Sequence, residues 1–343
     1  MRAHGAEGPN VEDDMDFRIK RRATLFGAVA LLAATSFVPA FAQDKPVLRF
    51  SAVFSEQDIR AEMLKQFGEG VAGFATLEPY YGGNLFKQGT ELVALQRGNL
   101  EMGNIAPQDV SNQIPAWSVL TSGYLFRDAA HLRAFFDSEV GAEFKKMAED
   151  QLGIRILGPT YFGIRQVGLR GDKAIKTPAD MAGIKLRMPG GDAWQFLGTA
   201  LGANPTPMAY AEVYTGLQTG AIDGQDNPLP NVENMKFYEV MDQIVLTSHL
   251  VGYDLLVISK AAWDKLAPAD QEALQAAATA AIDFSQAKHV AREAELLEKF
   301  KADGLNIYEP DVASFRANAQ KLYLESELAK SWPEGVLDKI NAL

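Results

Sequence analysis

Apolar residues alternate with polar ones, or recur at helical intervals, along the chain from residue 47 onward. Residues 47–53 alternate apolar and polar side chains around Arg49 and Ser51, which is typical of a strand. Within residues 56–69, Ile59, Met63 and Phe67 recur every four positions and would form one face of a helix. The predicted elements of this first set are strands at 47–53, 77–81 and 102–105 and helices at 56–69 and 88–97. Alternation of strand and helix predicts a mostly parallel α/β sheet with helices on its faces.

The pattern then repeats in the second part of the chain. Helical periodicity covers 129–151 and a strand follows at 154–160. The second set consists of strands at 165–169, 184–188, 222–224, 244–246 and 255–258 and of helices at 194–201 and 210–220. No Pro-rich or Ser-rich linker separates the two sets. The sequence therefore predicts two lobes joined by short strand crossings, as in a hinged clamp, rather than two independent domains.

Residues 268–303 are rich in strong helix formers and exceed the ~8–20 residues of most globular helices. A single helix of this length would brace both lobes from behind. Two ordinary helices with an unmarked break fit the pattern equally well.

The first 42 residues have the features of a secretory signal peptide. A basic cluster at 18–22 precedes 16 almost entirely apolar residues at 23–38, and the small-x-small sequence Ala40-Phe41-Ala42 follows. A membrane anchor needs ~20 apolar residues, so this run is too short. Residues 1–14 are expected to be an N-terminal extension. The pair Arg21-Arg22 leaves the general secretory and twin-arginine routes both open. We expect a soluble exported protein.

Composition restricts the possible chemistry. The net charge of −11 argues against a nucleic-acid partner, because such proteins neutralise phosphates with Lys and Arg. Without cysteine there is no thiol nucleophile, zinc–thiolate site or iron–sulfur cluster. No phosphate-binding loop, His-Glu-x-x-His or Gly-x-Ser-x-Gly sequence occurs. We therefore expect neither a metal nor a cofactor, and a binding protein rather than an enzyme.

Two segments concentrate polar chemistry at strand ends. Arg187 ends an apolar strand and precedes Pro189-Gly190-Gly191, and ligands of α/β sheets bind at the carboxyl ends of strands. Its guanidinium can hold a carboxylate through two parallel hydrogen bonds, although a surface arginine at a strand end is the alternative. Asn227, fixed before Pro228, offers a donor and an acceptor, unless it only forms an Asx turn.

Several ordered segments resemble the DctP-type substrate-binding subunits of TRAP (tripartite ATP-independent periplasmic) transporters. They are residues 126–128, 163–166, 185–189, 204–208, 212–214, 217–218, 223–228 and 236–240. The resemblance spans essentially the whole mature chain. It implies a two-lobed α/β periplasmic binding protein with mixed or parallel sheets, interlobe hinge strands and a long bracing helix. Lobe I would comprise residues 43–162 and 253–290, and lobe II residues 163–252 and 291–343.

The resemblance also implies the residues of the binding site. The carboxylate-binding arginine of the family falls on Arg187, a second arginine used for acidic sugars on Arg165, and the cleft asparagine on Asn227. Tyr210 stands where relatives place an aromatic ring against the ligand.

One departure affects the expected ligand. Relatives that bind sialic acid carry a Glu where this chain has Ala106-Pro107-Gln108, which disfavours sialic acid. Gln108 or Asn84 would instead contact a ligand hydroxyl, unless either is only a turn residue.

The resemblance implies a small organic acid as ligand, and we favour a sugar acid such as a uronate or aldonate. A C4-dicarboxylate or a 2-keto acid is the alternative within the family, and an exported enzyme or a ligand sensor is the alternative outside it. The implied partners are the small and large integral membrane subunits of the transporter, with the binding protein itself a monomer.

Overall fold

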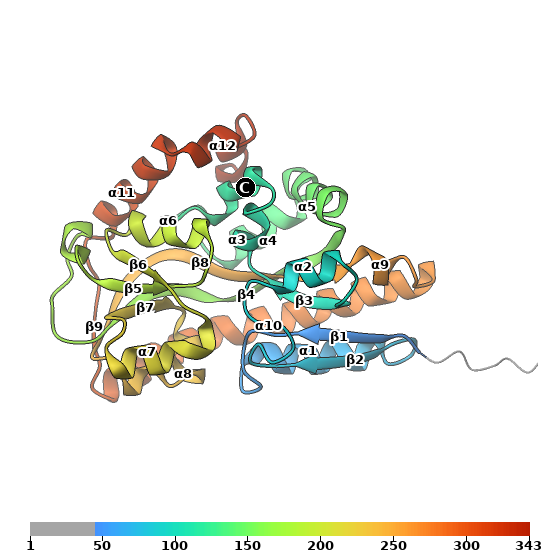
Figure 1. Ribbon diagram of the computed structural model, residues 1–343, viewed down its shortest axis with the longest axis horizontal. Coiled ribbons are helices and arrows are strands. Elements are labelled where there is room, and N and C mark those ends of the chain that lie inside the picture. The colour runs from blue at the N-terminus through green and yellow to red at the C-terminus, as the bar shows by residue number, and fades with distance from the viewer. Residues whose placement is uncertain (1–44) are drawn as a thin grey trace, which may run out of the picture. The chain divides into compact units, whose positions relative to one another are not determined.

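The computed structural model describes residues 45–343, so the signal peptide predicted at 1–42 lies outside the described residues. Within them, one sheet has the strand order β2-β1-β3-β8-β4-β7-β5-β6, and β9 pairs with β8 (Figure 1). The strands are β1 (Val47–Ser51), β2 (Thr76–Tyr80), β3 (Met102–Ile105), β4 (Ile154–Leu169), β5 (Lys185–Met188), β6 (Asn204–Pro207), β7 (Gly224–Asn227), β8 (Gln243–Ser259) and β9 (Asn306–Tyr308).

Helices flank this sheet. The α-helices are α1 (Ile59–Val71), α2 (Glu91–Gln96), α3 (Pro107–Ser111), α4 (Ala129–Asp137), α5 (Glu139–Leu152), α6 (Asp192–Ala200), α7 (Val213–Thr219), α8 (Leu229–Asn234), α9 (Lys260–Trp263), α10 (Pro268–Ala302), α11 (Val312–Glu325) and α12 (Val336–Asn341). The 3₁₀-helices are η1 (Pro115–Thr121), η2 (Pro178–Met181), η3 (Tyr210–Glu212), η4 (Phe237–Glu239) and η5 (Glu327–Ser331). Among residues 45–343, no helix combines the length and apolar character needed to cross a membrane.

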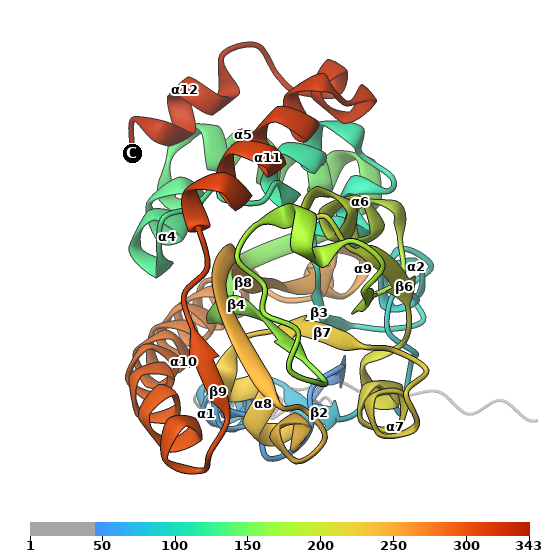
Figure 2. The same ribbon diagram turned by 90° about the vertical axis from the view of Figure 1, so that its left-hand side faces the viewer.

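The sheet has two parallel halves joined by two long antiparallel strands. In the first half, β1 pairs in parallel with β2 and β3, and in the second half β5 pairs in parallel with β6 and β7. Between them, β4 and β8 pair with each other over most of their 16 and 17 residues, or about 50 Å. Figure 2 shows these two strands running together through the molecule. This is the mixed α/β architecture with interlobe strands that the resemblance implies, although the crossing strands are long and not short as the sequence pattern suggests.

The prediction of separate strands at 154–160 and 165–169, and at 244–246 and 255–258, is wrong because the ladder continues through each interruption. The register of β4 against β8 shifts at three places, one of them between Tyr161 and Gly163. Such bulges break the alternation of side chains without ending a strand. Gly163 has a φ of +123°, which only glycine adopts readily, and so masks the strand in the sequence pattern.

The stretch at 268–303 is a single helix, which settles the choice that the pattern left open. Its 35 residues extend about 52 Å. Near its start, Leu274, Ala278 and Ile282 pack in the core formed with α1 and β1, and near its end Leu296 and Phe300 pack in the core formed with α7 and α8. The helix therefore braces both halves, and Figure 1 shows it running from the side of α9 to the side of β9 and α8.

Two further predicted elements differ in detail. The strand expected at 222–224 begins only at Gly224 and continues to Asn227 as β7, because that segment pairs with β4 and β5. The helix expected at 210–220 divides into η3 and α7.

The chain ends on the first half of the fold. Val336 and Ile340 of α12 pack in the same core as Phe135 and Phe144, while α11 contacts α6 and β8. The residue boundaries of the two lobes stay predictions.

Candidate functional site

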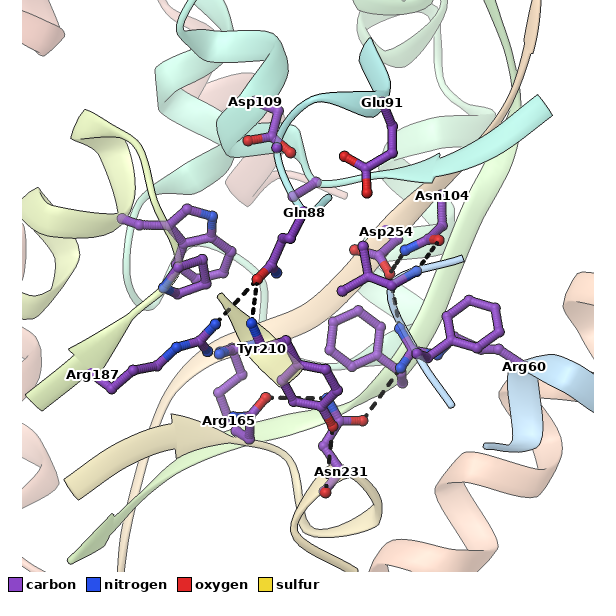
Figure 3. A pocket seen from close by; sticks show the side chains of 18 residues that line it. Arg60, Gln88, Glu91, Asn104, Asp109, Arg165, Arg187, Tyr210, Asn231 and Asp254 are labelled. Atoms are coloured by element: carbon purple, nitrogen blue, oxygen red, sulfur yellow. Dashed lines mark hydrogen bonds and ion pairs between the residues drawn. The ribbon is translucent and has the colours of Figure 1, made fainter. Parts of the chain in front are cut away.

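A cavity of about 50 Å³ lies where the two halves meet. Residues of α1, α2, β3, α3 and the loop after β1 line it from the first half, residues of β5, α6, η3, β7 and α8 line it from the second, and β4 and β8 contribute one or two residues each. Its polar lining residues are Arg60, Gln88, Glu91, Asn104, Asp109, Arg165, Arg187, Asn227, Asn231 and Asp254 (Figure 3). Arg165, Arg187, Tyr210 and Asn227, which the sequence analysis selects, all line this cavity.

Arg187 is a buried cation without a carboxylate partner. It is the third residue of β5, and its side chain is 1% exposed. Its Nε donates to the carbonyl of Met208 at 2.8 Å and its Nη2 to Oε1 of Gln88 at 3.2 Å. Among residues 45–343, no carboxylate lies within ion-pair distance of it. Burial lowers the pKa of Arg187 to about 10, against the opposing attraction of Asp226. An anion entering the cavity would therefore neutralise a charge that is costly to bury.

Arg165 is neutralised within the protein. Its Nε and Nη2 donate to the Asp226 carboxylate at 2.7 and 3.0 Å, and Nη2 also donates to the carbonyl of Asp226 at 2.6 Å. His249 Nε2 lies 3.1 Å from the same carboxylate. Although burial opposes ionisation, Arg165 and His249 hold the pKa of Asp226 far below its usual range. Arg165 lies 4.9 Å from the Trp194 ring centre and forms part of the cavity wall.

Arg60 is also paired. Its guanidinium donates to Asp58 and to Asp254, both at 2.8 Å, and lies between the rings of Phe54 and Phe162 at 4.3 and 4.4 Å from their centres. Burial alone would lower the pKa of Arg60, but the attraction of the two carboxylates raises it above its ordinary value. Arg60 is thus a fixed structural charge at the junction of the halves.

Gln88 connects the two halves across the cavity. Its Oε1 accepts from Arg187 Nη2 and from the backbone N–H of Tyr210 at 2.8 Å. Figure 3 shows this amide between Arg187 and Tyr210. A guanidinium and a backbone N–H that converge on one oxygen are the donors that a carboxylate oxygen would use.

Asn227 and Tyr210 line the cavity from the second half. Asn227 Nδ2 donates to Gln225 Oε1 at 2.6 Å, and its Oδ1 accepts from Asn231 Nδ2 at 3.1 Å. The Tyr210 hydroxyl donates to the carbonyl of Asn231 at 3.4 Å, and burial raises the pKa of Tyr210 above its ordinary value. This network orients the amide and the ring without bringing another charge into the site.

The structure places neither Gln108 nor Asn84 at the cavity. Gln108 is 2% exposed on α3, and the next residue, Asp109, lines the cavity instead. One residue along a helix turns the side chain by about 100°, so the two face different directions. Asn84 is exposed in the loop after β2.

Sequence reasoning missed the other polar lining residues, which are Arg60, Gln88, Glu91, Asn104, Asp109, Asn231 and Asp254. Two of these left a detectable signal, because a charged residue stands in line with apolar ones on a helix face. Arg60 precedes Leu64, Phe67 and Val71 at intervals of four, three and four, and all four are buried. Glu91 precedes the buried Ala94 and Leu95 in the same way. Gln88 left no such signal, since it lies in the loop before α2.

Comparison with known proteins identifies close similarity to solute-binding proteins. Residues 52–330 match the family model DctP, bacterial extracellular solute-binding protein family 7. The chain is 32% identical to the sialic acid-binding periplasmic protein SiaP of Vibrio cholerae over 80% of this chain and 84% of that protein.

Two solved structures extend this similarity. A TRAP periplasmic solute binding protein from Roseobacter denitrificans with bound 3-deoxy-D-manno-oct-2-ulosonic acid (KDO) is 50% identical, with a TM-score of 0.86 over 87% of this chain and 99% of that one. Another, from Sulfitobacter with bound β-D-galacturonate, is 27% identical, with a TM-score of 0.78 over 86% and 97%.

Proposed function

Because the chain belongs to the DctP family of bacterial extracellular solute-binding proteins, we propose that it captures a sugar acid by an arginine–carboxylate clamp and delivers it to TRAP membrane subunits. Members of this family bind solutes and do not catalyse a reaction. The proposal therefore concerns which ligand is held and by which residues.

The uncompensated charge of Arg187 is the observation that carries the proposal. Three arginines line the cavity, and Arg60 and Arg165 have carboxylate partners within the chain. Arg187 instead donates to two neutral oxygens, of Met208 and Gln88. A monoanionic ligand would supply the missing charge, and each charge-assisted bond contributes about 1.5–3 kcal/mol.

We propose that Gln88 moves aside when the ligand binds and that the halves then close around the ligand. Gln88 Oε1 already accepts hydrogen bonds from Arg187 Nη2 and the Tyr210 N–H, which are donors that a ligand carboxylate would need. An incoming acid therefore takes over Arg187 and the Tyr210 N–H, and closure of the halves around it removes competing water. Because the ligand binds the closed form more tightly than the open form, it shifts the population toward the closed form.

Sugar acids are supported as the ligand class by the relatives. KDO and β-D-galacturonate are bound in the two similar structures, and the 50% identity of the first makes KDO the first acid to test. Sialic acid is disfavoured because this chain has Ala106-Pro107-Gln108, and therefore no Glu, where sialic acid-binding relatives carry a Glu.

Location and partners follow from the same reasoning. We place the mature protein in the periplasm, after removal of the predicted signal peptide at 1–42, as a monomer that docks on the small and large membrane subunits. Arg165, Asn227 and Tyr210 support the clamp from the second half.

Isothermal titration calorimetry tests the proposal. The purified protein is titrated with KDO, D-galacturonate, succinate and pyruvate, and the tightest of these is then titrated into Arg187→Ala, Arg187→Lys and Arg97→Ala. Arg97 is exposed and outside the cavity, so its variant is the matched control.

We expect a sugar acid to bind tightest. Arg187→Ala should weaken it at least 100-fold and Arg187→Lys by an intermediate factor, because a lysine keeps the charge but not the planar pair of donors. Equal affinity of Arg187→Ala and Arg97→Ala would refute the clamp.

A further inference from the structure

Glu91 is a buried carboxyl that the clamp does not use. It is the first residue of α2, is 1% exposed and lines the cavity together with Arg187. Within residues 45–343, its Oε1 has no hydrogen-bond partner. A buried acceptor left unpaired costs free energy, so its retention at a ligand cavity points to a partner that the ligand provides.

Asp109 lies on the same wall of the cavity. It follows Gln108 on α3, and its charge adds to the burial that raises the pKa of Glu91 to about 8. Burial likewise raises the pKa of Asp109 to about 7. Figure 3 shows both carboxyl groups above Gln88, while Arg187 lies to one side below it. The cavity thus has a cationic wall at Arg187 and a separate wall of carboxyl groups.

We propose that Glu91, with Asp109 beside it, hydrogen-bonds hydroxyl groups of the ligand remote from its carboxylate, and so selects a polyhydroxylated monoacid. The inference rests on the proposed function, since it takes Arg187 as the site of the carboxylate. A ligand hydroxyl can donate to the unpaired Oε1 of Glu91. A methylene in that position would leave the oxygen unpaired.

The wall formed by Glu91 and Asp109 also disfavours the alternative organic acids, the C4-dicarboxylates and the 2-keto acids. A second ligand carboxylate beside Glu91 and Asp109 would be repelled by these groups where they are ionised. Where they are protonated, the new negative charge would raise their pKa further. A C4-dicarboxylate that binds Arg187 through one end is therefore rejected at the other. Short 2-keto acids lack the hydroxyl donors altogether.

The test compares two substitutions at position 91 by calorimetry with KDO at pH 7. Glu91→Met has about the same length but no oxygen, whereas Glu91→Gln keeps a carbonyl oxygen at the same place. Glu143→Met, at an exposed glutamate of α5 outside the cavity, is the matched control. Thermal unfolding without ligand checks that each variant is folded.

We expect Glu91→Met to weaken KDO binding at least tenfold, Glu91→Gln to retain more affinity than Glu91→Met, and Glu143→Met to bind within twofold of wild type. The inference is overturned if Glu91→Met binds KDO within threefold of wild type, or if wild type prefers succinate to KDO. A wild-type protein that binds none of the acids would refute the proposed function itself, whereas binding that is lost in Arg187→Ala but unchanged in Glu91→Met would refute only the role of Glu91.

Discussion

Replacing Glu91 by Gln should stabilise the fold in a pH-dependent manner. The ordinary glutamate pKa of 4.5 is raised to about 8 in the folded protein, chiefly by burial and then by the nearby charge of Asp109. Below pH 4.5 the carboxyl is protonated in both the folded and unfolded states, so ionisation contributes no difference. Between pH 4.5 and 8 the unfolded chain releases the proton and the folded chain keeps it, which lowers the stability of the wild type as pH rises.

The size of the effect follows from the two pKa values. Each pKa unit corresponds to ~1.4 kcal/mol, so the full difference has an upper bound of about 5 kcal/mol above pH 8. Relaxation of the site and entry of water around the ionised carboxylate reduce this bound. We therefore expect a net pH-dependent gain of ~2–4 kcal/mol for Glu91→Gln.

Urea unfolding at pH 5.0 and pH 8.5 measures this gain. The free energy of unfolding of Glu91→Gln relative to wild type should be larger at pH 8.5 than at pH 5.0 by ~2–4 kcal/mol. Glu143→Gln, at an exposed position, should show no such difference. An equal effect of Glu91→Gln at the two pH values would show that the Glu91 carboxyl ionises normally in the folded protein and would refute the reasoning.

Three further substitutions test the framework that holds the site. Gly163→Ala should lower the free energy of unfolding by ~2–4 kcal/mol, because the new Cβ would lie 2.6 Å from the Pro228 Cβ and residue 163 has a φ of +123°. An unchanged midpoint of thermal unfolding would show that alanine is not strained at this position. Arg60→Met should cost ~3–5 kcal/mol in urea unfolding, since it leaves two buried carboxylates without their cation; a loss below 1 kcal/mol would show that the pair is not needed. Asp226→Asn should leave Arg165 as a second unpaired cation and destabilise the unliganded protein by ~3 kcal/mol at pH 7, whereas equal urea midpoints would argue against this pairing.

Much of the fold could be predicted from local patterns, and the exceptions have physical causes. The helix at 56–69 and the strand at 47–53 correspond closely to α1 and β1, because a single apolar face decides each. The continuity of β4 and β8 was hidden by bulges, which shift the alternation of side chains without breaking the ladder. The single helix α10 could not be distinguished from two, since its apolar face changes partner between the two halves.

The site was only partly accessible to the same reasoning. Strand-end position and chemistry single out Arg187 and Asn227, and the family resemblance adds Arg165 and Tyr210; the structure brings all four to one cavity. Their roles in binding stay predictions. Neither strand-end position nor the family resemblance singles out Glu91 and Asp109, because their place in the site depends on which face of α2 and of α3 turns toward the cavity. A charged residue in line with buried ones, as at Glu91, is the signal to seek in such sequences.

Calorimetric titration of the wild-type protein with KDO and with the methyl ester of KDO tests the central claim most directly. The ester keeps every hydroxyl group but removes the charge that Arg187 is proposed to neutralise. Loss of two charge-assisted bonds of about 1.5–3 kcal/mol each predicts an affinity at least 100-fold weaker for the ester than for the acid. Equal affinity for acid and ester would contradict the account, because Arg187 would then not be holding the carboxylate.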